Sequence, residues 1–174
     1  MPISMSSVSL PSYEIGLNAL AAVLDKAEAF AAAKKIDAAV LLQTRLAPDM
    51  FALTRQVQIA CDMAKNGMAR LAGVEAPKYD DNETTIAQLK ERIGKTVAFL
   101  KSLDPAAINA AIDREIVFPM GGTNKGAMKG SDYLAFYMTP NVYFHLVAAY
   151  SILRHCGVEI GKRDFLGPIP VRMV

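Results

Sequence analysis

Apolar side chains recur every three or four residues along four long stretches of this chain, and this spacing is typical of amphipathic helices. The predicted helices are a short one over 37–44 and long ones over 11–33, 48–71, 85–103 and 139–156. Pro11 and Pro48 stand at the expected starts of two helices, while Gly73 and Gly157 follow the expected ends of two. The pattern predicts an all-α fold, namely an antiparallel four-helix bundle with a long crossover between the third and fourth long helices.

A short segment before the last long helix has a different composition. Residues 115–119, EIVFP, are mostly β-branched or aromatic, and Gly121 and Gly122 follow them closely. With the segment GAMKGS after the glycines, they predict a small β-hairpin-like excursion. We expect the whole chain, residues 1–174, to form a single domain, because this length suffices for one hydrophobic core.

Composition and charge exclude several classes of function. The 19 Lys and Arg residues nearly balance the 17 Asp and Glu residues, and no basic run indicates a nucleic-acid partner. No apolar run reaches the roughly 18 residues of a membrane span, so we expect no membrane association. Cys61 and Cys156 are too far apart for a zinc knuckle and too few for a disulfide framework. With no recognisable signal peptide, these features predict a cytoplasmic protein.

Asn141 and His145 lie four residues apart in the last long helix and should share one face. The His145 imidazole can be a metal ligand or a core side chain whose hydrogen bonds are satisfied within the protein. The Asn141 amide can offer only a weak carbonyl ligand, or it can cap the helix. The residues alone leave both alternatives open.

Gln58 and Asp62 have the same spacing in the second long helix. Asp62 lies between Cys61 and Met63, where a charge is unexpected if this face is buried. It can be a ligand, an ion-pair partner of an arginine such as Arg154, or a solvated edge residue. We take Gln58, Asp62, Asn141 and His145 as the candidate lining of a cleft between helices.

The stretches NVYFHLVAAYSILRHCGVEIGKRDFLG (141–167) and RLAPDMFALTRQVQIACDMAK (45–65) resemble an uncharacterised bacterial branch of the DinB/YfiT-like superfamily. This resemblance implies an antiparallel four-helix bundle with a long crossover. Many members of that superfamily hold a divalent metal with three histidines, one from the second helix and two, four residues apart, from the last. The resemblance places His145 at the final ligand position, Asn141 at the preceding one and Gln58 near the position in the second helix.

Two amides thus stand where the resemblance implies imidazoles, and tight Zn or Ni sites are built on imidazole, thiolate or carboxylate donors. We therefore expect a degenerate site that has no cofactor or binds a divalent metal such as Zn or Ni only weakly, through His145. The corresponding function is a non-catalytic DinB-like protein that binds a small molecule or acts as a homodimeric interaction protein. The alternative is a divalent-metal-dependent enzyme, thiol transferase-like or hydrolase-like, that uses His145 in the cleft.

Overall fold

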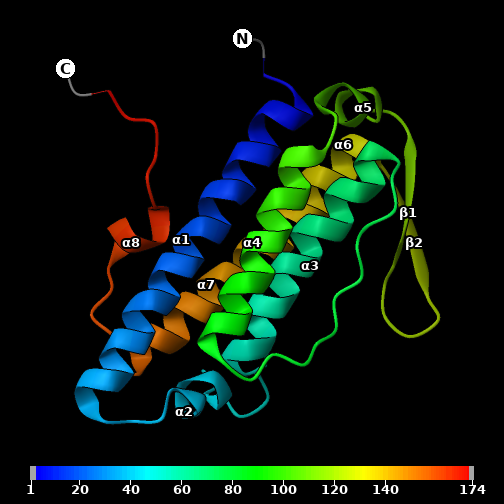
Figure 1. The fold of residues 1–174 in the computed structure, drawn as a ribbon. Helices are drawn as coiled ribbons and strands as arrows, with labels where there is room; N and C mark the ends of the chain where they lie inside the picture. The colour runs from blue at the N-terminus through cyan, green and yellow to red at the C-terminus, as the bar shows by residue number, and fades with distance from the viewer. Residues whose placement is uncertain (1–2, 173–174) are drawn as a thin grey trace.

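The computed structural model describes residues 3–172, and four long helices packed side by side dominate it (Figure 1). They are α1 (Met5–Lys34), α3 (Leu53–Ala72), α4 (Ile86–Ser102) and α7 (Thr139–His155). The shorter elements are α2 (Ala38–Gln43), α5 (Pro105–Ala110), β1 (Glu115–Pro119), β2 (Lys125–Lys129), α6 (Gly130–Asp132), the π-helix η1 (Tyr133–Met138) and α8 (Lys162–Leu166). The prediction of a mostly helical fold with one small antiparallel sheet is confirmed. Among residues 3–172, no helix is long and apolar enough to cross a membrane.

Helix α1 begins at Met5, well before the predicted start at Pro11. The Ser4 hydroxyl accepts a hydrogen bond from the Ser7 backbone N–H (3.3 Å), and the Ser7 hydroxyl accepts one from the Ser4 N–H (2.8 Å). This reciprocal cap satisfies backbone donors at the helix start. Pro11 lies inside the helix and removes one backbone hydrogen bond. Met5 and Ser9 are buried, so packing of the first turns offsets that loss.

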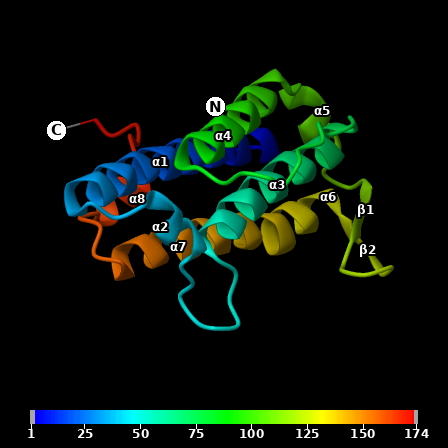
Figure 2. The same ribbon diagram turned by 60° about the horizontal axis from the view of Figure 1, so that its bottom comes forward.

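Helix α3 begins at Leu53, later than the predicted start at Pro48. Residues 44–52 form a loop whose base is closed by a hydrogen bond from the Leu53 N–H to the Thr44 carbonyl (3.0 Å). This closure holds Pro48 in the loop. Figure 2 shows the loop, between α2 and α3, extending away from the bundle.

The long crossover of the fold follows α3, not α4 as predicted. Gly73 ends α3 with a φ of 73°, and residues 74–85, which we call the strap, run back along the bundle before α4 begins (Figure 1). Helix α4 therefore runs parallel to α3, which differs from the fully antiparallel arrangement that we expected. Helix α7 is antiparallel to α3, because Gln56 meets His145 at one end of the pair and Gly67 meets Met138 at the other. Apolar periodicity identifies buried faces but carries no information on helix direction, and this explains the error.

The predicted hairpin is confirmed, since β1 and β2 pair in antiparallel register before the last long helix. Phe118 of β1 packs on the rings of Tyr133 and Tyr137, with centroid distances of 4.8 and 4.4 Å. Both tyrosines belong to η1, which continues into α7 without a break. The helical path also continues through Pro140, and the residues just before this proline form the wider π-helical turns of η1.

Candidate functional site

His145 projects from α7 into the interior and contacts Gln56 of α3. Its Nδ1 lies 2.7 Å from the Gln56 Oε1, and both side chains are buried. The Gln56 Nε2 donates to the Phe51 carbonyl (3.2 Å), which fixes the orientation of the amide. An amide oxygen only accepts hydrogen bonds, so the His145 Nδ1 carries the proton and donates it. The imidazole is thus already held by a partner within the protein.

The surroundings of His145 keep its ring uncharged. Burial, assisted by the positive charge of Arg55, lowers the pKa of His145 from 6.5 to about 4. A charged imidazolium loses its hydration in such an environment, and the nearby guanidinium repels it. At neutral pH His145 is therefore a neutral Nδ1–H tautomer with a single unprotonated nitrogen, Nε2.

Asn141 is engaged elsewhere. Its Nδ2 donates to the backbone carbonyl of Tyr137 at 2.6 Å. Tyr137 belongs to η1, the π-helical segment that precedes α7. This hydrogen bond holds the Asn141 amide on its own helix, four residues back along the chain.

Gln58 and Asp62 face the strap and α4. The Gln58 Nε2 donates to a Glu83 carboxylate oxygen at 2.8 Å. The Asp62 Oδ1 accepts from an Arg92 guanidinium nitrogen at 2.8 Å and pairs with Lys65 at 3.2 Å. The arginine partner of Asp62 is thus Arg92 and not Arg154. Gln58 and Asp62 share no hydrogen bond or ion pair with Asn141 or His145 in the described part of the chain.

These contacts belong to a larger set of charges, which we call the charged cluster. Its members are Arg55, Lys65, Arg92, Asp62, Asp81 and Glu83. Arg92, which is almost fully buried, contacts Glu83 at 2.8 Å and Asp81 at 3.0 Å. Burial alone would raise the pKa of Glu83, but hydrogen bonds from Arg92 and Gln58 outweigh that effect and lower it. Three positive and three negative side chains balance, and the buried Arg92 and Lys65 each have a carboxylate partner, as buried charges require.

The charged cluster holds the strap against α3 and α4. The Lys65 ammonium donates to the Pro77 carbonyl at 2.7 Å and lies 3.9 Å from the centroid of the Tyr79 ring. Beneath it Cys61 is fully buried, and burial raises the pKa of its thiol to about 12. A thiol of this kind is inert as a nucleophile, since thiolate formation controls cysteine reactivity. The contacts of Gln58 and Asp62 therefore stabilise the fold.

Sequence reasoning missed Gln56, the residue of the second long helix that actually meets His145. A signal was available, because the apolar side chains Leu53, Val57 and Ala60 form a stripe that includes position 56 by helical spacing. Gln58 lies two residues further on, about 200° around the helix, and so faces another neighbour.

The donor set does not fit a tight transition-metal site. Such sites use several imidazole, thiolate or carboxylate donors that converge on one point. In residues 3–172 no three His, Cys, Asp or Glu side chains are grouped to hold an ion. His145 supplies one nitrogen, next to the amides of Gln56 and Asn141, both of which are engaged in hydrogen bonds. We therefore derive no chemistry that passes through a metal here.

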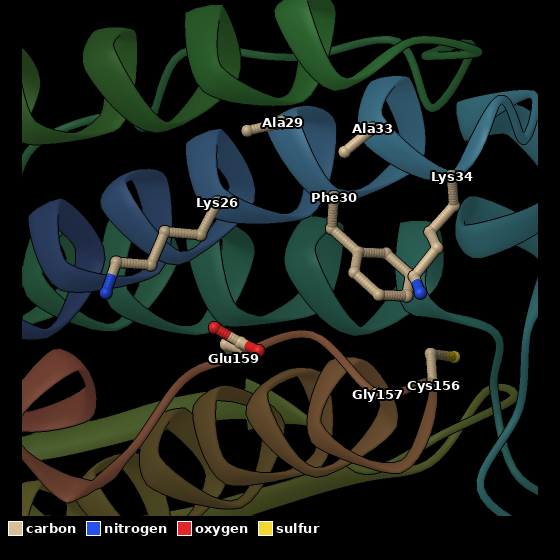
Figure 3. Close-up of a pocket in the computed structure, with 8 residues that line it drawn as sticks. All are labelled: Lys26, Ala29, Phe30, Ala33, Lys34, Cys156, Gly157 and Glu159. Atoms are coloured by element: carbon tan, nitrogen blue, oxygen red, sulfur yellow. The ribbon is translucent and has the colours of Figure 1, made fainter.

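Two cavities with partly apolar walls lie away from the four candidate residues. One, of about 790 Å³, lies between α1 and the segment after α7, and includes Lys26, Phe30, Lys34, Cys156 and Glu159 (Figure 3). The other, of about 350 Å³, lies between α7 and loop 44–52. Neither includes Gln58, Asp62, Asn141 or His145. The four polar residues instead contact other groups of the protein; Gln58 and His145 are buried, and Asp62 and Asn141 are half-buried.

The four long helices and the strap define a DinB-like helical protein. Its single buried histidine, His145, stands in place of the three histidines that the metal-binding members of the superfamily use. Residues 5–166 match the family model described as a domain of unknown function, DUF1993, and the chain belongs to this family. A crystal structure of a DinB family member protein from Shewanella denitrificans is similar, with 44% sequence identity and a TM-score of 0.90. The alignment covers 97% of this chain and 95% of that one. No curated protein matches the chain. The resemblance to an uncharacterised DinB-like branch is thereby confirmed.

Proposed function

We propose that this DUF1993 protein is a non-catalytic interaction protein that works as a homodimer through the exposed face of η1 and α7. The observation that carries the proposal is the absence of charge along this face. No Asp, Glu, Lys or Arg occurs between Asp132 and Arg154, yet Phe136 and Phe144 are 73% and 57% exposed. An ordinary surface helix carries charged side chains on its solvent face, and a helix that is apolar all round is normally buried.

Loop 44–52 enlarges the same apolar surface. Leu46 and Phe51 of the loop are exposed, and Leu46 lines a shared cavity with Val147 of α7. Contiguous exposed apolar surface of this kind marks interaction sites in soluble proteins. A second copy is the simplest occupant, because an uncharged face complements itself and two-fold dimers are the commonest assemblies.

The interior supports a non-catalytic role. A metal-dependent enzyme, thiol transferase-like or hydrolase-like, would need further donors beside His145 to hold the ion that activates a thiol or a water. Gln56 and Asn141 offer only engaged amides, and Asp62 is committed to Arg92. The two cysteines of the described chain are unpaired, which agrees with a reducing cytoplasmic location.

Small-molecule binding is the second candidate, favoured by the cavity in Figure 3. Its volume of about 790 Å³ lies within the range of ligand sites, and the Phe30 ring forms part of its wall. Lys26 and Lys34 flank that ring on α1, and Glu159 lies opposite. Thermal melts with a panel of apolar carboxylates test this candidate, because a bound ligand raises the melting temperature by mass action.

Light scattering of the tag-free protein tests the homodimer. We expect about twice the chain mass of 18.8 kDa, and we expect Phe144→Lys to shift the mass toward one chain. Val117→Lys is the matched control, because Val117 is also exposed but lies on the hairpin. A wild-type protein that stays at one chain mass at high concentration would refute the homodimer. Stoichiometric metal in the same sample, lost in His145→Ala, would restore the metal-dependent enzyme.

A further inference from the structure

The exposed apolar residues of η1 and α7 form a stripe whose spacing is nearly the same when read in either direction along the chain. It consists of Phe136, Pro140, Phe144 and Val147, which recur at intervals of four, four and three residues and are all exposed. We propose that two copies pair across this stripe as an antiparallel two-fold dimer, with Phe136 of one protomer opposite Val147 of its partner. This inference rests on the proposed homodimer and specifies its register.

The register follows from the spacing of the stripe. In an antiparallel pair, a two-fold axis midway between Pro140 and Phe144 brings Phe136 opposite Val147 and Pro140 opposite Phe144. Every position of the stripe then meets another position of the stripe, as an isologous interface requires. A pairing displaced by one helical turn in one direction would leave Phe136, the most exposed aromatic side chain of residues 3–172, opposite Ser151. A displacement in the other direction would pair Phe136 with Phe144 but leave the exposed Val147 opposite the buried Tyr133.

A cavity lies where this register needs one. The space of about 350 Å³ between α7 and loop 44–52 is lined by Leu46, Met50, Val147 and Ala148, among others. The phenyl ring of Phe136 from the partner would enter it from the side of Val147. Buried aromatic anchors in apolar pockets are the usual centres of protein interfaces.

The charges at the two ends of the stripe agree with the same axis. Asp132 precedes Phe136 by four residues, and Arg154 follows Val147 by seven, so both lie on or near the face of the stripe. The two-fold that pairs Phe136 with Val147 brings Asp132 opposite Ser151 of the other protomer, one helical turn before Arg154 and within reach of its long side chain. The uncharged centre and the opposite charges at its ends are thus complementary to a second copy in antiparallel orientation.

A charge exchange across the axis tests the register. Phe136→Lys should weaken dimerisation at least about tenfold, because two ammonium groups are then forced into apolar surroundings. Adding Val147→Glu should recover most of that loss, since each new lysine meets a new glutamate in the partner. Positions 136 and 147 are about 16 Å apart along one helix, so the two groups cannot pair within one chain.

Sedimentation equilibrium at low and high salt gives the dissociation constants, and circular dichroism checks folding. The double variant Phe136→Lys with Val117→Glu is the control, because it has the same net charge but places the glutamate on the hairpin. The register is supported if dimerisation recovers when Val147→Glu is added to Phe136→Lys but not when Val117→Glu is added. High salt should weaken that recovery, because it depends on an ion pair. Equal behaviour of the two double variants overturns the register but leaves the homodimer intact. A monomeric wild type, or a dimer indifferent to both Phe136→Lys and Phe144→Lys, overturns both proposals.

Discussion

Replacing Arg92 by methionine should lower the free energy of unfolding by about 3 kcal/mol, near the lower end of the cost of breaking a buried ion pair. The magnitude follows from what happens to the three carboxylates that Arg92 contacts. The Glu83 side chain is 9% exposed and would keep its charge in the interior without its main partner. Asp62 and Asp81 are 27% and 42% exposed, so water can replace the guanidinium at both. Most of the loss therefore comes from Glu83.

Urea unfolding followed by circular dichroism measures this loss, and Lys95→Met is the matched control. Lys95 lies on the same helix as Arg92 and pairs with Glu91 at 2.7 Å, but both side chains are exposed. Its removal should change stability by no more than about 0.5 kcal/mol. Adding Glu83→Gln to Arg92→Met should recover roughly 1 kcal/mol or more, because the unpaired buried charge is then gone.

Hydrogen exchange locates the effect. The strap amides should exchange faster in Arg92→Met than in the wild type, since strap residues Asp81 and Glu83 lose their anchor on α4. An Arg92→Met protein as stable as Lys95→Met, with unchanged exchange in the strap, would refute the view that the charged cluster holds this crossover in place.

Three further predictions concern packing, pH and thiol access. Gly67→Ala should cost about 1–2 kcal/mol in urea unfolding, because a Cβ at position 67 would lie 1.9 Å from the Met138 sulfur and force the core apart. The pKa of His145 is depressed from 6.5 to about 4, so the unfolded chain takes up the proton first as pH falls. Stability should therefore decline between pH 6.5 and 4, by up to about 3 kcal/mol, and His145→Gln should lack this decline in pH-dependent melts. A thiol reagent should modify the partly exposed Cys156 in the native protein and reach Cys61, whose pKa is about 12, only on unfolding; equal rates would contradict this.

Local spacing identified the helices because it reports directly on burial. In α4, Ile86, Leu89, Ile93 and Val97 recur at helical spacing and are all buried. Helix starts were less predictable, since Pro11 and Pro48 are compatible with both a helix start and other positions. The Ser4–Ser7 cap and the closure of loop 44–52 decided the outcome, and the second of these depends on contacts beyond the helix itself.

The partners of the polar residues could not be predicted in the same way. Asp62 and Arg92 are distant in sequence, and they meet only because the strap returns the chain to run α4 parallel to α3. Gln56 and Gln58 are two residues apart in α3, which corresponds to about 200° of helix rotation, and only Gln56 faces His145. Helical spacing places Gln56 on the face of Leu53, Val57 and Ala60, but Gln58 is buried as well and the two amides are chemically identical.

Within residues 3–172, nearly all polar groups of the interior have their hydrogen-bond partners in the protein, whereas one apolar surface has no partner within the chain. Among the described residues, the Arg92 Nε is the only buried side-chain nitrogen or oxygen without a hydrogen-bond partner. An interior in which nearly every polar group is satisfied gains little by exchanging those partners for a substrate or an ion. The surface of η1 and α7 differs, because Phe136, Phe144 and Val147 are exposed to water. No charged residue occurs between Asp132 and Arg154 to make this surface hydrophilic. Covering that surface would release water from apolar side chains without breaking an ion pair, and this supports the proposed association of two copies.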